Sequence, residues 1–206
     1  MFKWLKKLYN WVLSWAETPY GGIALFLLAF AESSFFPVPP DVLLIALCMG
    51  EPRKSLKFAL YCSIGSVLGG MLGYAIGHFF FHTFKDQILG FLSVVTLKDG
   101  YELYEAVKTH FDTFGVLWIG VAGFTPIPYK IFTITAGAMD LVFIPFVLIS
   151  AASRSARFFL VAGLIGLLFK KYGEKIQIFI DKYFNLLTIL FALLLVLGFL
   201  VIKYLH

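Results

Sequence analysis

Long apolar runs separated by short polar stretches dominate the chain. The runs cover residues 21–50, 56–82, 115–139, 143–169 and 184–205. A helix needs about 20 apolar residues to cross a bilayer, so the second, fourth and fifth runs predict plain transmembrane helices. The first and third differ because prolines interrupt each of them near its middle. The pattern predicts an all-α integral membrane protein with two broken segments.

The two broken segments are alike. The first contains FFPVPPDVLLIALCMG and the other GFTPIPYKIFTITAGAM. When their Pro-x-Pro motifs are aligned, at an offset of 89 residues, Asp41 falls opposite Lys130 and Gly77 opposite Gly166. A helix rich in glycine or other small residues follows each broken segment. We interpret the chain as a duplicated unit, a broken element plus a helix, with a last helix added.

The breaks themselves are unusual inside a bilayer. Proline removes a backbone donor and clashes with the preceding turn, and freed backbone groups cannot face lipid, so such breaks lie inside protein or line a wet cavity. Paired breaks in the two halves of a chain indicate the binding site of a transporter. The breaking residues are Pro37, Pro39, Pro40, Pro126 and Pro128.

Two geometries fit each broken segment: a re-entrant hairpin, or a single crossing by a discontinuous helix. The halves of about 15 and 10 residues are too short to span singly, which favours hairpins. Only one crossing then separates the two hairpins, so they enter from opposite faces. The predicted fold is an inverted repeat of a re-entrant hairpin plus a transmembrane helix, with the hairpin tips meeting near the midplane.

Two further segments are amphipathic. Residues 1–17 begin MFKWLKKLYNWVLSW, which predicts a basic, tryptophan-rich interfacial helix. A signal peptide is disfavoured because Lys6 and Lys7 interrupt its apolar core. Residues 85–113 carry many charges, with apolar residues at helical spacing, and predict an amphipathic connector on the membrane surface.

Composition agrees with one membrane domain over residues 1–206. The chain is 60% hydrophobic and 14% charged, whereas soluble domains have about 25% charged residues. In both geometries ten lysines and arginines flank the N-terminal side of the membrane and four the opposite side. The positive-inside rule therefore predicts a cytoplasmic N-terminus. The net charge of +5 comes from lysines at membrane borders and does not indicate a nucleic-acid partner.

Five ionisable residues interrupt the apolar regions. Each central charge costs roughly 2.5–3.5 kcal/mol on insertion scales, so the five must pair with one another or meet water. Two acids and three bases leave one surplus positive charge, and a cavity with that balance favours an anion. The five are Glu32, Asp41, Lys130, Arg154 and Arg157.

Two roles fit these charges. Arg154 and Arg157 lie three residues apart on one helix face, and a guanidinium fork matches a phosphate group. Alternatively, both arginines only neutralise Glu32 and Asp41 and brace the fold. Lys130, opposite Asp41, predicts an ion pair that joins the hairpin tips. We expect Arg154, Arg157 and Lys130 to bind substrate, and Glu32 with Asp41 to couple protons.

No residue pattern indicates catalysis. Nucleophile, P-loop and dinucleotide motifs are absent, so neither an enzyme nor a bound cofactor is expected. His78 and His82 have a spacing that can bind metal, but no third ligand is near them in the sequence. We interpret them as interfacial histidines without a metal, and expect Asp140 to be solvated.

Small polar and apolar residues are assigned structural roles. We expect Cys48 and Cys62 to be buried small hydrophobes, and a glycine stripe at Gly65, Gly69 and Gly73 to pack helices closely. Hydroxyl side chains near the breaks are expected to bond freed backbone more often than a ligand. They are Ser33, Ser34, Thr125, Thr133 and Thr135.

The broken segments and charges together resemble the DedA family, which shares a region with the eukaryotic SNARE-associated, or VTT, membrane proteins. ESSFFPVPPD, the glycine-rich helix, GFTPIPYKIFTITAG and SRSARF carry the resemblance, over about residues 20–170. It implies two opposed re-entrant hairpins and movement of a lipid phosphate, undecaprenyl phosphate in bacterial members, with coupling to protons or membrane potential; eukaryotic relatives are scramblases. The family's functional acids map to Glu32 and Asp41, and its later arginine to Arg154 or Arg157.

This chain departs from the family pattern at the second proline motif. Many members have arginines on both sides of it, whereas here Phe124 and Thr125 precede it and Lys130 is the only base after it. The chain is similar to a shorter subfamily with TPIPYK in that place. We expect a lipid carrier, with a proton-coupled ion or drug exchanger, a scramblase without coupling, or a structural membrane protein as alternatives. The oligomeric state, monomer or homo-oligomer, stays open.

Overall fold

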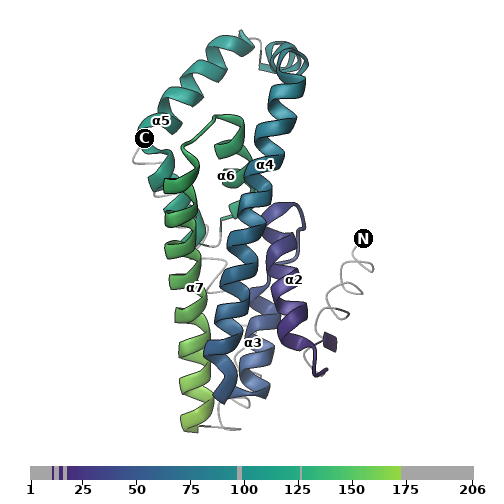
Figure 1. Ribbon diagram of the computed structural model, residues 1–206, viewed down its shortest axis with the longest axis vertical. Helices are drawn as coiled ribbons and strands as arrows, with labels where there is room; N and C mark the ends of the chain where they lie inside the picture. Colours follow the sequence, from purple (N-terminus) through teal and green to yellow (C-terminus); the bar gives the residue numbers. More distant parts are fainter. Residues whose placement is uncertain (1–10, 12–13, 16–17, 97–98, 126, 173–206) are drawn as a thin grey trace. The chain divides into compact units, whose positions relative to one another are not determined.

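The computed structural model of the chain describes Trp11, Ser14, Trp15 and residues 18–96, 99–125 and 127–172. Within these residues all regular structure is helical and no strand occurs (Figure 1). Most of the predicted interfacial helix, Pro126 and the predicted helix 184–205 lie outside the described residues. Every contact discussed below lies within one compact unit, which ends at Gly166.

The first broken segment forms two helices, α2 (Gly21–Ser34) and α3 (Asp41–Gly50). The chain reverses between them (Figure 1). The reversal brings Gly21 at the start of α2 against the side chain of Leu47 near the end of α3. Pro40 directly precedes α3, where its missing N–H costs nothing because the first amides of a helix have no partner within it. The prolines thus end one helix and begin the next.

The helix that follows is longer than the sequence predicts. After the short 3-10 helix η2 (Pro52–Lys54), α4 runs from Ser55 to Thr96 with a kink at Phe84, which has φ −117° and ψ 21°. The predicted boundary between a transmembrane helix (56–82) and the connector falls at this kink. No proline lies between the kink and Thr96, so the helix resumes after one distorted residue.

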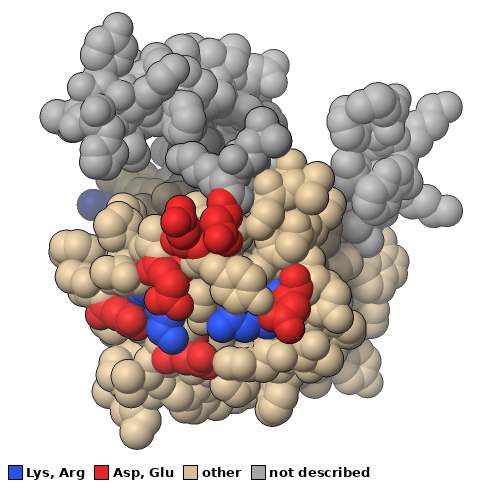
Figure 2. Space-filling view, turned by 90° about the horizontal axis from the view of Figure 1, so that it is seen from above, with Lys and Arg blue, Asp and Glu red and all other residues tan. Residues whose placement is uncertain are grey.

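The connector is not one separate helix. Its first part belongs to α4, and the rest begins α5 (Gly100–Phe124), which the Asp99 side chain caps by accepting from the Tyr101 amide. Figure 2 shows acidic and basic side chains gathered on this end of the molecule. The exposed acids of the connector are Asp86, Asp99, Glu102, Glu105 and Asp112.

The second broken segment combines the end of α5 with α6 (Tyr129–Ala138), and α7 (Phe143–Tyr172) follows. The chain reverses here too, since Gly115 in α5 lies against Leu141 just beyond α6. The helices α3 and α6 each have ten residues and each begins directly after a proline. Whether the two units arose by duplication stays a prediction.

Close packing on α4 holds both reversals in place. A Cβ atom at Gly65 or Gly69 would lie 2.3 or 2.1 Å from the carbonyl oxygens of Phe26 or Phe30 in α2, so only glycine permits this approach. Gly77 lies equally close to the Ile134 carbonyl in α6. Cys48 and Cys62 are buried free thiols in the apolar core, as predicted.

Two described helices are long and apolar enough to cross a membrane. They cover Pro52–Phe91 and Phe143–Tyr172. Both coincide with apolar runs from which transmembrane helices are predicted, whereas α2 and α3 are shorter apolar helices. The two helices around the first break are therefore shorter than the two that could cross a membrane.

Candidate functional site

The buried charges meet where the two broken segments approach α7. Arg154 of α7 contacts Glu32 near the end of α2, with 2.9 Å between the guanidinium Nη2 and the carboxylate Oε2. The Arg154 side chain is 3% exposed and that of Glu32 13%. A pair so well shielded from water must satisfy its remaining hydrogen-bonding groups within the protein.

The surroundings of Arg154 meet that requirement. Its Nε donates to the Ser66 hydroxyl at 2.5 Å, and Ser66 in turn lies 2.7 Å from the Ser33 hydroxyl. The guanidinium lies over the rings of Tyr129 and Phe158, at 4.8 and 4.7 Å from their centroids. Arg154 thus links α2, α4 and α6 to α7, through charge, hydrogen bonds and cation–π contacts.

A second pair lies closer to the surface. Arg157 of α7 contacts Asp41, the first residue of α3, with 2.8 Å between Nη2 and Oδ2. It also donates from Nη1 to the backbone carbonyl of Thr125 at the end of α5. The two side chains are 17% and 20% exposed. Arg157 therefore joins both chain reversals while staying within reach of water.

The predicted pair between Asp41 and Lys130 does not form. Lys130 donates instead to the backbone carbonyl of Phe36 at 2.9 Å, and no described carboxylate forms an ion pair with it. The two motifs do meet, since Phe36 belongs to the first break and Lys130 follows the second. The surplus positive charge of the cluster is therefore the ammonium of Lys130.

An apolar pocket of about 460 Å³ lies beside α2. Phe36 and Leu43 at the first break contribute to its wall, so the carbonyl that accepts from Lys130 belongs to a residue of the pocket. Pro37 and Pro39 in the same break are exposed, whereas Pro40 is buried; Pro128 of the second break is exposed. The pocket residues are Trp11, Trp15, Tyr20, Ile23, Ala24, Leu27, Leu28, Ala31, Phe36 and Leu43.

The hydroxyl side chains near the breaks bond mainly to the backbone, as expected. Ser34 donates to the carbonyls of Phe30 and Gly69, and Thr133 to that of Lys130. Sequence reasoning missed Ser66, which bonds Arg154. Its only signal was a polar residue inside the glycine stripe of α4.

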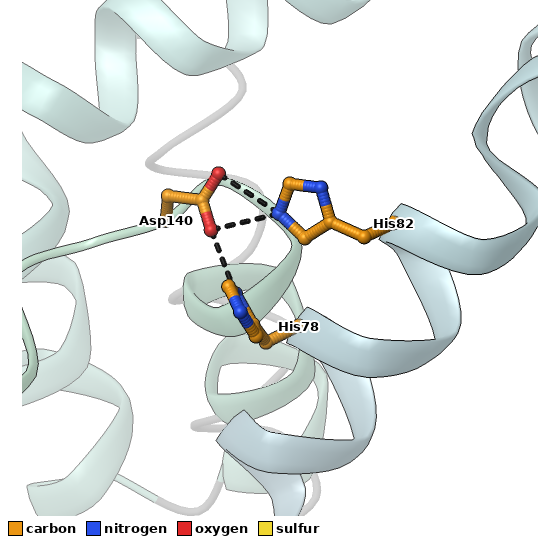
Figure 3. A group of neighbouring side chains, drawn as sticks. All are labelled: His78, His82 and Asp140. Carbon is orange, nitrogen blue, oxygen red and sulfur yellow. Dashed lines mark hydrogen bonds and ion pairs between the residues drawn. The ribbon is translucent and has the colours of Figure 1, made fainter.

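The histidines outside the cluster have a neighbour that their spacing in the sequence does not show. Asp140 was expected to be solvated, and no third ligand lies near His78 and His82 in the sequence. The side chain of Asp140 remains 36% exposed, but its carboxylate lies 2.7 Å from His78 Nδ1 and 3.0 Å from His82 Nε2 (Figure 3). The turn between α6 and α7 brings the three side chains together across about 60 residues of sequence.

The sequence matches a known protein family. A family model described as VTT domain matches residues 36–167. The chain belongs to the VTT-domain family. The resemblance to DedA and SNARE-associated proteins is therefore confirmed, and because members of the family are membrane proteins, this VTT protein is a membrane protein. The matched range contains Asp41, Lys130, Arg154 and Arg157 and begins four residues after Glu32.

Related VTT proteins occur in bacteria and archaea. An uncharacterized protein of Haemophilus influenzae is 40% identical over 82% of this chain and 85% of its own length. An uncharacterized protein of Histophilus somni is 36% identical over the same shares. One of Methanocaldococcus jannaschii is 25% identical over 67% of this chain and 79% of its own. No solved structure matches the chain.

Proposed function

We propose that this VTT protein is a carrier, not an enzyme, that moves a lipid phosphate across the bacterial inner membrane. Undecaprenyl phosphate and phospholipids are the candidate substrates. One observation supports the proposal above the others: the ammonium of Lys130 lies at the carbonyl of Phe36, and Phe36 also lines an apolar pocket. A lipid phosphate has the matching two parts, an anionic headgroup and an apolar tail.

The charge arrangement supports one order in which the bases would meet the headgroup. Arg154 and Arg157 are each engaged by a carboxylate, whereas Lys130 is bonded only to a backbone carbonyl and to nothing of opposite charge among the described residues. An anion can replace that carbonyl without breaking an ion pair. We therefore assign the first contact with the phosphate to Lys130. A later contact is assigned to Arg157, whose side chain is 17% exposed.

The proposed membrane arrangement follows from helix length. At 1.5 Å per residue, the ten-residue helices α3 and α6 are about 15 Å long, half of the roughly 30 Å hydrocarbon core. We propose that α2–α3 and the end of α5 with α6 are re-entrant hairpins of an inverted repeat, entering from opposite faces. The cluster would then lie near the midplane, with the N-terminus cytoplasmic.

Protons are the proposed coupling ion. Protonation of Asp41 would release Arg157, and protonation of Glu32 would release Arg154, so each acid can exchange a partner for a proton. The side chain of Asp41 is 20% exposed and that of Glu32 13%, so Asp41 is the more accessible of the two acids. Because both carboxylates are already paired, an uncoupled scramblase is the second candidate: it would need neither pair to open.

The test is headgroup translocation in liposomes of purified protein. Undecaprenyl phosphate and ordinary phospholipids are compared side by side, with and without a pH gradient. We expect gradient-sensitive movement of the polyprenyl phosphate alone. Movement of every lipid regardless of gradient would identify a scramblase, and movement of none would refute lipid transport and favour an ion or drug exchanger.

Matched variants locate the activity. Lys130→Met should reduce translocation at least about tenfold, because no other described base in the cluster is free of a carboxylate partner. Lys57→Met removes an exposed lysine outside the cluster and should transport like wild type. Asp41→Asn should retain some movement but lose its dependence on the gradient. Equal activity of all variants would contradict the assigned site.

A further inference from the structure

Two histidines and one aspartate converge outside the charge cluster. His78 and His82 project from adjacent turns of α4, and Asp140 reaches them from the turn between α6 and α7 (Figure 3). The carboxylate Oδ1 lies 2.7 Å from His78 Nδ1 and 3.0 Å from His82 Nε2, and Oδ2 lies 3.1 Å from the same Nε2. The donor atoms of the three residues all lie within 4.8 Å of one another.

Several contacts fix this geometry. A Cβ atom at Gly137 would lie 2.0 Å from the Tyr74 carbonyl and 2.8 Å from the His78 amide, so the end of α6 is seated directly on α4 at this level. The Tyr74 hydroxyl donates to the Leu141 carbonyl at 2.7 Å, which ties the turn to α4 from its other side. Asp140 itself has φ 57°, a left-handed conformation that few residues other than glycine adopt. The turn is therefore held so that its carboxylate faces both imidazoles.

We propose that His78, His82 and Asp140 form a binding site for a single divalent transition-metal ion of the zinc type. Two imidazole nitrogens and one carboxylate oxygen are a donor set that Zn²⁺ accepts, and the fourth position would be open to water. Mg²⁺ and Ca²⁺ prefer oxygen ligands only, so the two nitrogens disfavour them.

The nitrogen–oxygen distances suit such an ion after small side-chain rotations, and the two imidazoles, whose donor atoms lie within 4.8 Å of each other, would move closer together around it. Tetrahedral Zn²⁺ with bonds of about 2.0–2.1 Å separates its donor atoms by roughly 3.3 Å. The observed nitrogen–oxygen distances are a few tenths of an ångström shorter, as hydrogen bonds require. Metal binding needs both facing nitrogens unprotonated, so each imidazole would carry its hydrogen on the other ring nitrogen.

The site is accessible and its charge is favourable. The side chains of His78, His82 and Asp140 are 41%, 47% and 36% exposed, which leaves an entry path. Asp140 adds a carboxylate to the two imidazoles, so the donor set includes a group whose negative charge attracts a divalent cation.

The surroundings add to this attraction for a cation. Met139, next to Asp140, packs with Leu89 and Tyr104, so the site lies at the acid-rich α4–α5 end of the molecule. An acidic surface raises the local concentration of divalent cations. A bound ion would tie α4 to the α6–α7 turn and so restrain the second chain reversal, whatever the protein transports.

The experiment measures metal binding to the full chain in detergent, without a polyhistidine tag and after removal of metal by chelator. ZnCl₂ is titrated by calorimetry, and Co²⁺ is used as a spectroscopic probe whose visible bands report nitrogen and oxygen ligands. We expect one Zn²⁺ per chain, a higher unfolding temperature with Zn²⁺, and at least about a tenfold loss of affinity in His78→Ala, His82→Ala and Asp140→Asn.

The sequence offers a matched control, since it contains four histidines. The double variant His110→Ala with His206→Ala leaves only the two proposed ligands and should bind Zn²⁺ like wild type. The near-isosteric Asp140→Asn keeps the assay informative if an alanine variant fails to fold. Absence of stoichiometric binding by wild type, or equal binding by the three ligand variants, overturns the site. Uptake of no metal by a cluster that responds to pH also overturns the metal site. The three side chains would then only join α4 to the α6–α7 turn by hydrogen bonds.

Discussion

The two acid–arginine pairs of this VTT protein use the same chemistry in different surroundings. In Glu32–Arg154, the sealed pair, the arginine is 3% and the acid 13% exposed, and Ser66 and two aromatic rings also hold the arginine. In Asp41–Arg157 the two side chains are 20% and 17% exposed, respectively, and among the described residues the arginine's further hydrogen bond goes to a backbone carbonyl. The comparison indicates that the first pair mainly stabilises the fold and the second is placed to open.

The sealed pair should show the largest effect on stability. Arg154→Ala leaves Glu32 ionised without its partner and removes the guanidinium that donates to the Ser66 hydroxyl. We therefore expect a loss of about 3–5 kcal/mol in the free energy of unfolding. The measurement is thermal and denaturant unfolding in a fixed detergent. A loss below about 1 kcal/mol would show that Glu32 has another way to be satisfied.

This expectation changes how the arginine can be tested. A transport defect in Arg154→Ala alone does not separate binding from folding, because the side chain joins four helices. Transport by that variant must be compared at equal amounts of folded protein.

Removing the arginine of the more exposed pair, Asp41–Arg157, should cause a smaller loss in the free energy of unfolding. Arg157→Ala leaves Asp41 able to reach water, so we expect about 1.5–3 kcal/mol, the range for a hydrogen bond to a charged group. Transport in liposomes should fall more than stability does. If Arg157→Ala destabilised the protein as much as Arg154→Ala, the distinction between a sealed and an opening pair would be wrong.

Removing both charges of the sealed pair should nearly restore stability. Replacing a buried ion pair by groups of similar volume is often neutral, whereas removing one partner is not. We expect the free energy of unfolding of the double variant Glu32→Gln with Arg154→Met to lie within about 1 kcal/mol of the wild-type value. The hydroxyls of Ser33 and Ser66 can still bond each other in it. The double variant, set beside the two single variants in the same unfolding assay, measures their coupling.

Lys130 should have a smaller effect on stability than either arginine and a large effect on transport. It gives up a single hydrogen bond from a partly exposed ammonium to a neutral carbonyl, so Lys130→Met should cost about 1.5 kcal/mol, the lower end of the range for a charged group. The check is unfolding in detergent together with translocation by the same preparation. A variant that transports normally would place the anion contact elsewhere and favour the arginines after all.

The partners of the charges could not be read from the repeat. The offset of 89 residues put Asp41 opposite Lys130, and both do begin or nearly begin a ten-residue helix. A shared position within two units fixes where a residue lies along its helix, not which neighbour its side chain meets. The packing of α7 against both reversals put Arg157 at Asp41 and left Lys130 with a backbone carbonyl.

The histidine cluster escaped sequence reasoning for a related reason. The spacing of His78 and His82 was visible, but their third neighbour lies about 60 residues away, in a turn whose position depends on close contact of Gly77 and Gly137 with backbone across the α4–α6 interface. Helical periodicity describes contacts within four residues and carries no information on such a distance.

Hydropathy, proline geometry and the cost of buried charge act locally, so the amino-acid sequence is enough to predict a membrane protein with two proline-broken segments and five charges in apolar surroundings. It is not enough to tell which charges neutralise each other, which one is left over beside an apolar pocket, or which carboxylate meets the histidines. Those outcomes depend on where helices far apart in the sequence contact each other. The close contacts of the α4 glycines with the backbone of α2 and α6 fix how these helices are aligned along α4.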